Sequence, residues 1–177
     1  MAAVDVHRLK VVDEAGVNLA LTRLDGRAPA GARAVGSMPC NYGPNVTRLG
    51  ALGTTGREAL MTVDGATDGA VCRAFVAHVV GPTLQAGAVV VRDHLQAHKV
   101  AGIEAAITGC GARLISRPPY APDLSPIDQC WAKLKPCLRR IGARTREALA
   151  EAIAYAMEGI TAADALAWFA PWGYMAS

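Results

Sequence analysis

The alternation of hydrophobic and polar positions predicts a sheet whose strands come mostly early in the chain. The main strands are expected at residues 8–14, 46–54, 58–63, 87–91 and 112–116. A turn at Gly16 is expected to lead into an antiparallel partner strand over 17–24. The run GAVVV at 87–91 is uniformly apolar, which is typical of a central strand covered on both faces.

Apolar positions with a helical period predict helices between and after the later strands. They are expected at about 67–80, 96–108, 145–157 and 162–169, besides a helix that begins at Pro126. This order of elements predicts an α/β protein with a mixed sheet and helices on both faces. Ligands of such sheets gather at the carboxyl ends of the central strands. The predicted boundaries place Asp13 and Asp93 at strand ends.

The stretch RPPYAPDLSPIDQCWAKLKPCLRR, residues 117–140, is a proline-rich loop followed by an amphipathic helix. Ser125 is a good N-cap, and Pro126 fits the first helical position because it has no N–H to satisfy. One apolar stripe along this helix is formed by Ile127, Trp131, Leu134 and Leu138. The helix therefore carries an acid, Asp128, in its first turn and cations further on.

The spacing around Asp128 leaves two interpretations open. Ser125-x-x-Asp128 resembles a capping box, and an acid in the first turn suits the helix dipole. Caps are more frequent than catalytic acids, so spacing alone favours the cap. The alternative is a functional acid that meets Asp13 and Asp93 where their strands lie side by side.

Three carboxylates that converge on one point repel each other unless a cation holds them. Oxygen ligands select Mg²⁺ or Mn²⁺, and two such ions about 4 Å apart can activate a water or a 3′-hydroxyl for phosphoryl transfer. His94 and His98 are four residues apart, as in zinc sites, but no third ligand stands at metal spacing. Asp123 competes as the third acid, although its proline-rich surroundings favour a turn. Glu14 is interpreted as a surface or supporting acid.

Composition narrows the class of protein. A chain of 177 residues with 52% hydrophobic content suits one globular domain with a real core. No apolar run reaches the roughly 18 residues of a membrane helix, and no signal-peptide pattern opens the chain, so a soluble cytoplasmic protein is expected. The five cysteines are scattered without a C-x-x-C pair, which argues against a disulfide framework or a zinc knuckle.

Positive charge is concentrated in one segment of the chain. The net charge is only +3, but residues 129–146 hold six cations and no acid. These cations are Lys133, Lys135, Arg139, Arg140, Arg144 and Arg146. Such a cluster is often a solvated face, and it is also the electrostatic footprint expected of a phosphate-binding surface.

Three segments resemble the catalytic blocks of mariner-superfamily transposases. They are VVDEAG at 11–16, VVVRDHLQAHK at 89–99 and RPPYAPDLSPIDQCWAKLK at 117–135. The nearest match is the bacterial insertion-sequence branch, the family numbered six-thirty, whose third block typically reads PPYSPDLNPIE before a W-x-x-L-K run. The resemblance extends over residues 8–160 and implies a ribonuclease-H-like fold: a mixed five-stranded sheet with helices on both faces.

The resemblance also implies the residues of the site. By motif position, Asp13, Asp93 and Asp128 carry over as the catalytic ligands of two Mg²⁺ or Mn²⁺ ions. Positions 94 to 127, which are 34 residues, separate the second acid from the third. His98 and Lys99 match the family's His-Lys pair and are expected to contact DNA or orient the site. Backbone phosphates of DNA are expected to be held by Lys133, Lys135, Arg139 and Arg140.

The chain departs from the family pattern at named positions. Asp128 stands where the bacterial branch usually has Glu, and His94 stands where Asn is usual. Pro136 lies inside the predicted helix, where it removes a backbone hydrogen bond and is expected to kink the helix. No counterpart of the family's N-terminal helix-turn-helix region precedes residue 8. Residues 1–177 are therefore expected to be one catalytic domain, with a DNA-binding half that is encoded separately or lost.

The resulting hypothesis is a transposase catalytic domain that cleaves and joins DNA strands with Mg²⁺ or Mn²⁺. The implied partners are double-stranded DNA at transposon ends, a TA-rich target and a second copy of the chain on that DNA. The implied location is the bacterial cytoplasm, on the nucleoid when DNA is bound. Two alternatives stay open: an inactive or truncated remnant that binds DNA or a partner, and a stand-alone nuclease of the same fold, such as a resolvase or ribonuclease H.

Overall fold

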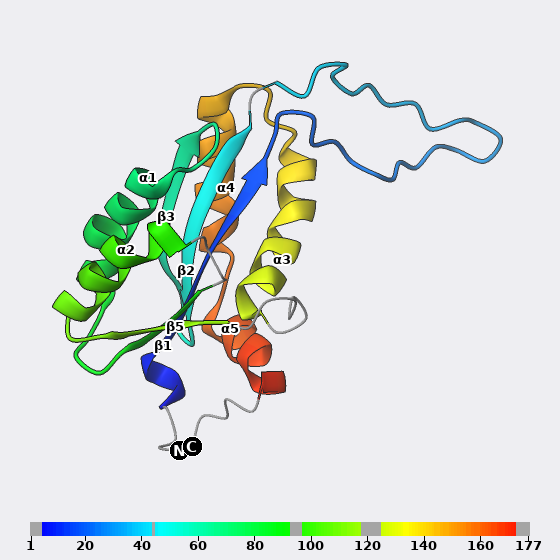
Figure 1. The fold of residues 1–177 in the computed structure, drawn as a ribbon. Helices are drawn as coiled ribbons and strands as arrows, with labels where there is room; N and C mark the ends of the chain where they lie inside the picture. The colour runs from blue at the N-terminus through cyan, green and yellow to red at the C-terminus, as the bar shows by residue number, and fades with distance from the viewer. Residues whose placement is uncertain (1–4, 44, 93–96, 118–124, 173–177) are drawn as a thin grey trace.

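A mixed sheet of five strands, in the order β3-β2-β1-β4-β5, forms the centre of the molecule. The computed structural model describes residues 5–43, 45–92, 97–117 and 125–172 (Figure 1). The strands are β1 Leu9–Val17, β2 Val46–Gly53, β3 Gly56–Asp64, β4 Val89–Arg92 and β5 Arg113–Ser116. The pairs β1–β2 and β2–β3 are antiparallel, whereas β1–β4 and β4–β5 are parallel. The predicted mixed five-stranded sheet is confirmed.

Helices cover both faces of this sheet, as predicted (Figure 1). One face carries α1 (Gly69–Phe75), which continues as a π-helical turn over Val76–Val80, together with α2 (Ala97–Gly109). The other face carries α3 (Pro126–Ile141), α4 (Arg146–Glu158) and α5 (Ala162–Phe169). Short 3₁₀ turns occur at Val6–Arg8, Gly81–Thr83 and Ala170–Trp172.

Each face of the sheet has its own hydrophobic core. Strand β4 supplies both cores by alternation, because Val89 packs with the α3 side and Val90 with the α1 side. The predicted apolar stripe of α3 is buried on the sheet, and Ile127, Trp131, Leu134 and Leu138 are each at most 3% exposed. Full burial of a side chain of this size contributes about 1.5–3 kcal/mol, so α3 is fixed firmly against β1 and β2.

The prediction that β1 ends near Asp13 and turns at Gly16 is wrong. Strand β1 continues to Val17, because its antiparallel pairing with β2 runs from Val11↔Leu52 to Val17↔Val46 and includes Gly16↔Thr47. Residues 17–24 therefore form no partner strand. After Val17 the chain leaves the sheet in a long loop, which projects away from the body before β2 begins (Figure 1). Asp13 consequently lies inside a strand.

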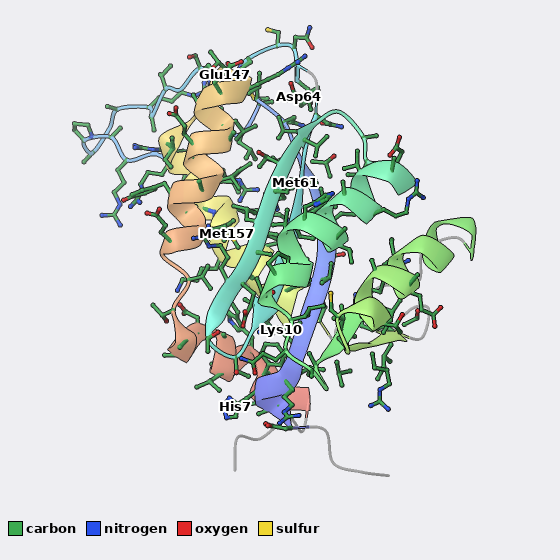
Figure 2. The ribbon with its side chains drawn as sticks, turned by 90° about the vertical axis from the view of Figure 1, so that its left-hand side faces the viewer. His7, Lys10, Met61, Asp64, Glu147 and Met157 are labelled. Carbon is green, nitrogen blue, oxygen red and sulfur yellow. The ribbon has the colours of Figure 1, made fainter. Side chains whose placement is uncertain are left out.

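The end of the sheet away from this loop is closed by polar contacts between β1 and the β2–β3 hairpin. Lys10 pairs with Glu58, and His7 Nδ1 lies 3.1 Å from Thr54 Oγ1. Figure 2 shows His7 and Lys10 together at this end, with Asp64 at the opposite end of β3. These contacts fix the position of β1 along its neighbours, and with it the position of Asp13.

Candidate active site

The first predicted acid, Asp13, lies in the middle strand of the sheet. Within the described residues the parallel pairing of β1 with β4 extends to Val12↔Arg92, and Asp13 is the next residue of β1. On the other side Asp13 is paired with Gly50 of β2. Strand alternation turns the Asp13 side chain toward α3, where its Oδ2 accepts a hydrogen bond from the Trp131 indole at 2.9 Å.

The third predicted acid, Asp128, is the third residue of α3 and its side chain is exposed. The capping-box interpretation is wrong, because the Ser125 side chain accepts no capping hydrogen bond. Its buried hydroxyl has no partner among the described residues. The backbone carbonyl of Ser125 accepts the Asp128 N–H at 3.0 Å instead. The Asp128 carboxylate is thus not used for capping the helix.

The negative charge of Asp128 reaches the carboxyl group of Asp13. Burial raises the pKa of the Asp13 carboxyl, and the negative charge of Asp128 raises this pKa further. The hydrogen bond from Trp131 and the positive charge of Arg117 oppose the rise. The structure therefore brings two of the three predicted acids into one electrostatic unit.

A group of residues that the sequence did not predict surrounds the Asp13 side chain. It consists of Trp131, Arg48 and Gly50. The Arg48 guanidinium lies 4.6 Å from the centroid of the Trp131 ring, and Arg48 is only 1% exposed. A Cβ built on Gly50 would lie 2.5 Å from Cη2 of that ring. The sequence placed Trp131 in an apolar stripe and in the W-x-x-L-K run of the third block, but predicted no partner for it. The available signal was its indole N–H, which needs an acceptor wherever the ring is buried.

The remaining predicted ligands fall where the structure gives no side-chain placement. Asp93, His94 and Asp123 are outside the described residues, and so are the side chains of His98 and Lys99 at the start of α2. Strand β4 does end at Arg92, directly before Asp93. Among the described residues no three His, Cys, Asp or Glu side chains form a group that could hold a metal. The full three-acid set stays a prediction.

A second polar group, made of the exposed Glu14 and the buried Arg92, lies on the opposite face of the sheet. Glu14 points toward α1, where its carboxylate accepts a hydrogen bond from Thr67. A cavity of about 270 Å³ adjoins it, lined by the sheet, α1 and α2. Arg92 lines this cavity with Nε and Nη2 unpaired among the described residues. Burial lowers the pKa of Arg92, whereas Cys72 and Glu14 oppose that shift.

The predicted phosphate-binding cations lie along α3 but differ in their surroundings. Lys135 and Arg140 are exposed, and Arg139 is half-buried. Lys133 instead forms an ion pair with Asp164 of α5, so part of its charge is already neutralised. At the end of α3 a cavity of about 460 Å³ is lined by four arginines, namely Arg23, Arg139, Arg140 and Arg144. A DNA-binding role for these residues stays a prediction.

The sheet order and the two helical layers define a ribonuclease-H-like fold, which the comparison with solved structures confirms. Residues 8–150 match the family described as DDE superfamily endonuclease, and the chain belongs to this family. A comparison with curated protein sequences gives no match. Placement in the bacterial insertion-sequence branch stays a prediction.

Structures of the Mos1 mariner transposase share this fold. The Mos1 paired-end complex with the left transposon end has a TM-score of 0.76 at 12% identity, covering 96% of this chain and 54% of that one. The Mos1 strand transfer complex gives 0.74 at 12% identity, covering 96% and 53%. The Mos1 catalytic domain with Raltegravir and Mn gives 0.71 at 12% identity, covering 93% and 77%. The chain spans about half the length of the transposases in the two DNA complexes.

Proposed function

We propose that this chain is the catalytic domain of a transposase that cleaves and joins DNA strands at a site formed by Asp13, Asp93 and Asp128. The observation that carries the proposal is the approach of Asp13 and Asp128, from β1 and α3, close enough for one charge to raise the pKa of the other. Membership in the DDE superfamily endonuclease family supports the same reaction class.

Two of the three proposed ligands, Asp13 and Asp128, are described residues, and both offer carboxylate oxygens suited to a divalent metal. Asp128 presents an exposed carboxylate that caps no helix, and Asp13 offers oxygen ligands beside it. Hard oxygen donors of this kind favour Mg²⁺ or Mn²⁺. Mos1 structures that contain Mn or Mg share the fold, which supports the same choice of cation. Asp13, Asp93 and Asp128 would hold these ions, which when bound activate the attacking oxygen and stabilise the leaving oxygen of a phosphodiester.

The chain's own residues shape the rest of the reaction. Asp13 is held by the hydrogen bond from Trp131, whereas the Asp128 side chain is exposed and would be open to substrate. Lys135, Arg139 and Arg140 would contact backbone phosphates, which gives affinity without reading sequence. His98 and Lys99 would contact the DNA strand near Asp93.

The wider setting of the proposal follows the family. The substrate is double-stranded DNA at transposon ends, with a TA-rich target, bound by two copies of the chain. A helix-turn-helix half would recognise the ends, and the reaction would take place on the bacterial nucleoid in the cytoplasm. Within the part of the chain that the structure describes, no helix has the length and apolar character to cross a bilayer.

Mn²⁺-dependent cleavage of a labelled DNA duplex tests the proposal. Wild type is expected to nick the duplex, and Asp93→Asn and Asp128→Asn are each expected to lower the rate at least a hundredfold without loss of folding. Asp25→Asn, at an exposed loop acid, is the matched control and should retain the wild-type rate. Equal rates in wild type and Asp93→Asn would overturn the assignment of the site. A folded wild type that binds DNA without cleaving it would support the remnant instead.

A further inference from the structure

We propose that Trp131 is a positioning residue for the first metal ligand, Asp13, and that Arg48 and Gly50 form the seat that holds its ring in place. This inference rests on the proposed function, because it assigns a role within the same metal site. It goes further by naming three residues, none of them an acid, as determinants of how tightly the site binds its cation.

A hydrogen bond joins Trp131 directly to Asp13. The Trp131 indole N–H donates to Oδ2 of Asp13 at 2.9 Å. An indole can only donate, so this contact favours the ionised carboxylate, which is the form that binds metal. It occupies one of the two carboxylate oxygens and fixes the rotation of the group, which leaves Oδ1 in a defined direction.

Trp131 and Asp128 lie close together on the same helix, α3. Trp131 follows Asp128 by three residues on α3, less than one helical turn. The helix that carries the third acid is therefore fastened directly to the first acid, 118 residues away in the sequence. A shift of α3 along the sheet would move Asp128 and break the hydrogen bond to Asp13 together. Through this bond, the distance between Asp13 and Asp128 depends on how α3 packs against the sheet.

Arg48 and Gly50 of β2 form the seat beneath the Trp131 ring. Arg48 and Gly50 are two residues apart on β2, so their positions face the same side of the sheet. The Arg48 guanidinium lies 4.6 Å from the centroid of the Trp131 ring. Any side chain at Gly50 would enter the space of the ring, because its Cβ would lie 2.5 Å from Cη2 and 3.0 Å from Cζ2. The ring is therefore confined on two sides.

A simpler role for Trp131 is to fill the core, since it is only 3% exposed. Both roles require the ring, but only the positioning role requires the N–H. Trp131→Phe keeps an aromatic ring and removes the donor, so it separates the two. Trp168→Phe is the matched control, because Trp168 packs partly buried against the same core.

Calorimetric titration of the intact chain with Mn²⁺ is the test, read beside thermal unfolding without metal. Trp131→Phe is expected to weaken Mn²⁺ binding by about 10- to 100-fold, the usual effect of removing a residue that orients a ligand. Trp168→Phe is expected to bind as wild type does. Mn²⁺ affinity in folded Trp131→Phe equal to that of wild type would overturn the inference while leaving the metal site standing. Wild type that binds no Mn²⁺, or Asp13→Asn that binds it as tightly, would overturn the proposed site and the inference with it.

A second measurement needs no Trp131 variant, in case Trp131→Phe does not fold. The indole N–H resonances of wild type are followed in a ¹H–¹⁵N spectrum during addition of Mg²⁺, with the Trp168 signal assigned from its absence in Trp168→Phe. One remaining indole signal is expected to shift with the Mg²⁺ occupancy while the Trp168 signal stays in place. Saturation with Mg²⁺ that moves no indole signal would overturn the inference.

Discussion

At the scale of single residues, the site buries charged groups, Asp13 and Arg48, in surroundings that disfavour their charged forms. Burial and the nearby charge of Asp128 raise the pKa of Asp13, which means that the ionised form is disfavoured in the folded protein. Arg48 is also buried, with Nε and Nη1 unpaired among the described residues. Burial lowers the pKa of Arg48, and the negative charge of Asp13 opposes that shift. Buried charges of this kind are typical of functional sites.

Gly50 gives the sharpest prediction at this scale. Gly50→Ala is expected to lower the free energy of unfolding by about 1–3 kcal/mol, because the new methyl group overpacks against the Trp131 ring. The displaced ring should also weaken Mn²⁺ binding. Thermal unfolding and Mn²⁺ titration measure the two effects.

The matched control for Gly50→Ala lies in the next strand. Gly16 pairs with Thr47 in the same β1–β2 ladder, yet a Cβ built on it meets no atom within 4 Å. Gly16→Ala should therefore leave both stability and Mn²⁺ binding close to wild type. Equal losses in the two variants would show that the β1–β2 ladder, and not the Trp131 seat, sets the cost.

At the scale of elements, local patterns predicted the helices well and missed the contacts between distant segments. The apolar stripe of α3 and the extent of α4 could be predicted because each depends on neighbours within a few residues. The full length of β1 could not, since its last residues are strand only through pairing with β2. The hydrogen-bond partner of Asp13 could not be predicted either, because Trp131 is 118 residues away in the sequence.

The contact between α3 and α5 shows how such distant pairing also affects charge. Lys133 of α3 pairs with Asp164, which also completes the capping box of α5 with Thr161. The hydrogen bond from Lys133, followed by those from Thr161, lowers the pKa of Asp164 from 3.8 to about 2. Lys133 is therefore one member of the cation cluster that takes part in holding the fold together.

A pH dependence of stability follows from this shift. The pKa of Asp164 is lower in the folded than in the unfolded protein, so its stabilising contribution is complete above about pH 4 and is lost as the pH falls to about 2. Asp164→Asn is expected to unfold at a lower temperature than wild type at pH 6, and the gap should close on acidification. Thermal unfolding from pH 6 to pH 2.5 measures it. In the Lys133→Met background the gap at pH 6 should be smaller, because the main cause of the shift is gone.

At the scale of the whole molecule, the fold separates the acids from most of the cations. Asp128 lies in the first turn of α3 and Asp13 is bonded to Trp131 one turn further on, whereas Arg139 and Arg140 lie near the end of the helix beside the 460 Å³ cavity. Arg144 ties that end to the long loop by donating to the carbonyls of Leu19 and Leu21, at 3.0 Å each. A helix of 16 residues spans about 24 Å, so a duplex that reached both ends would lie along α3.

This arrangement predicts how DNA binding responds to salt. Replacing Lys135, Arg139 and Arg140 together by Gln should weaken binding to any duplex sequence and reduce the slope of log K against log salt by roughly 2 to 3, about 0.9 for each phosphate that is no longer neutralised. Fluorescence anisotropy between 50 and 200 mM salt, with cleavage blocked by EDTA, measures the slope. Arg57→Gln, at an exposed cation near the start of β3, is the control and should change the slope by much less than one. A triple variant with the wild-type slope would place the DNA on another face, whereas a reduced slope would make α3 the common support of the acids and of the phosphate-binding cations.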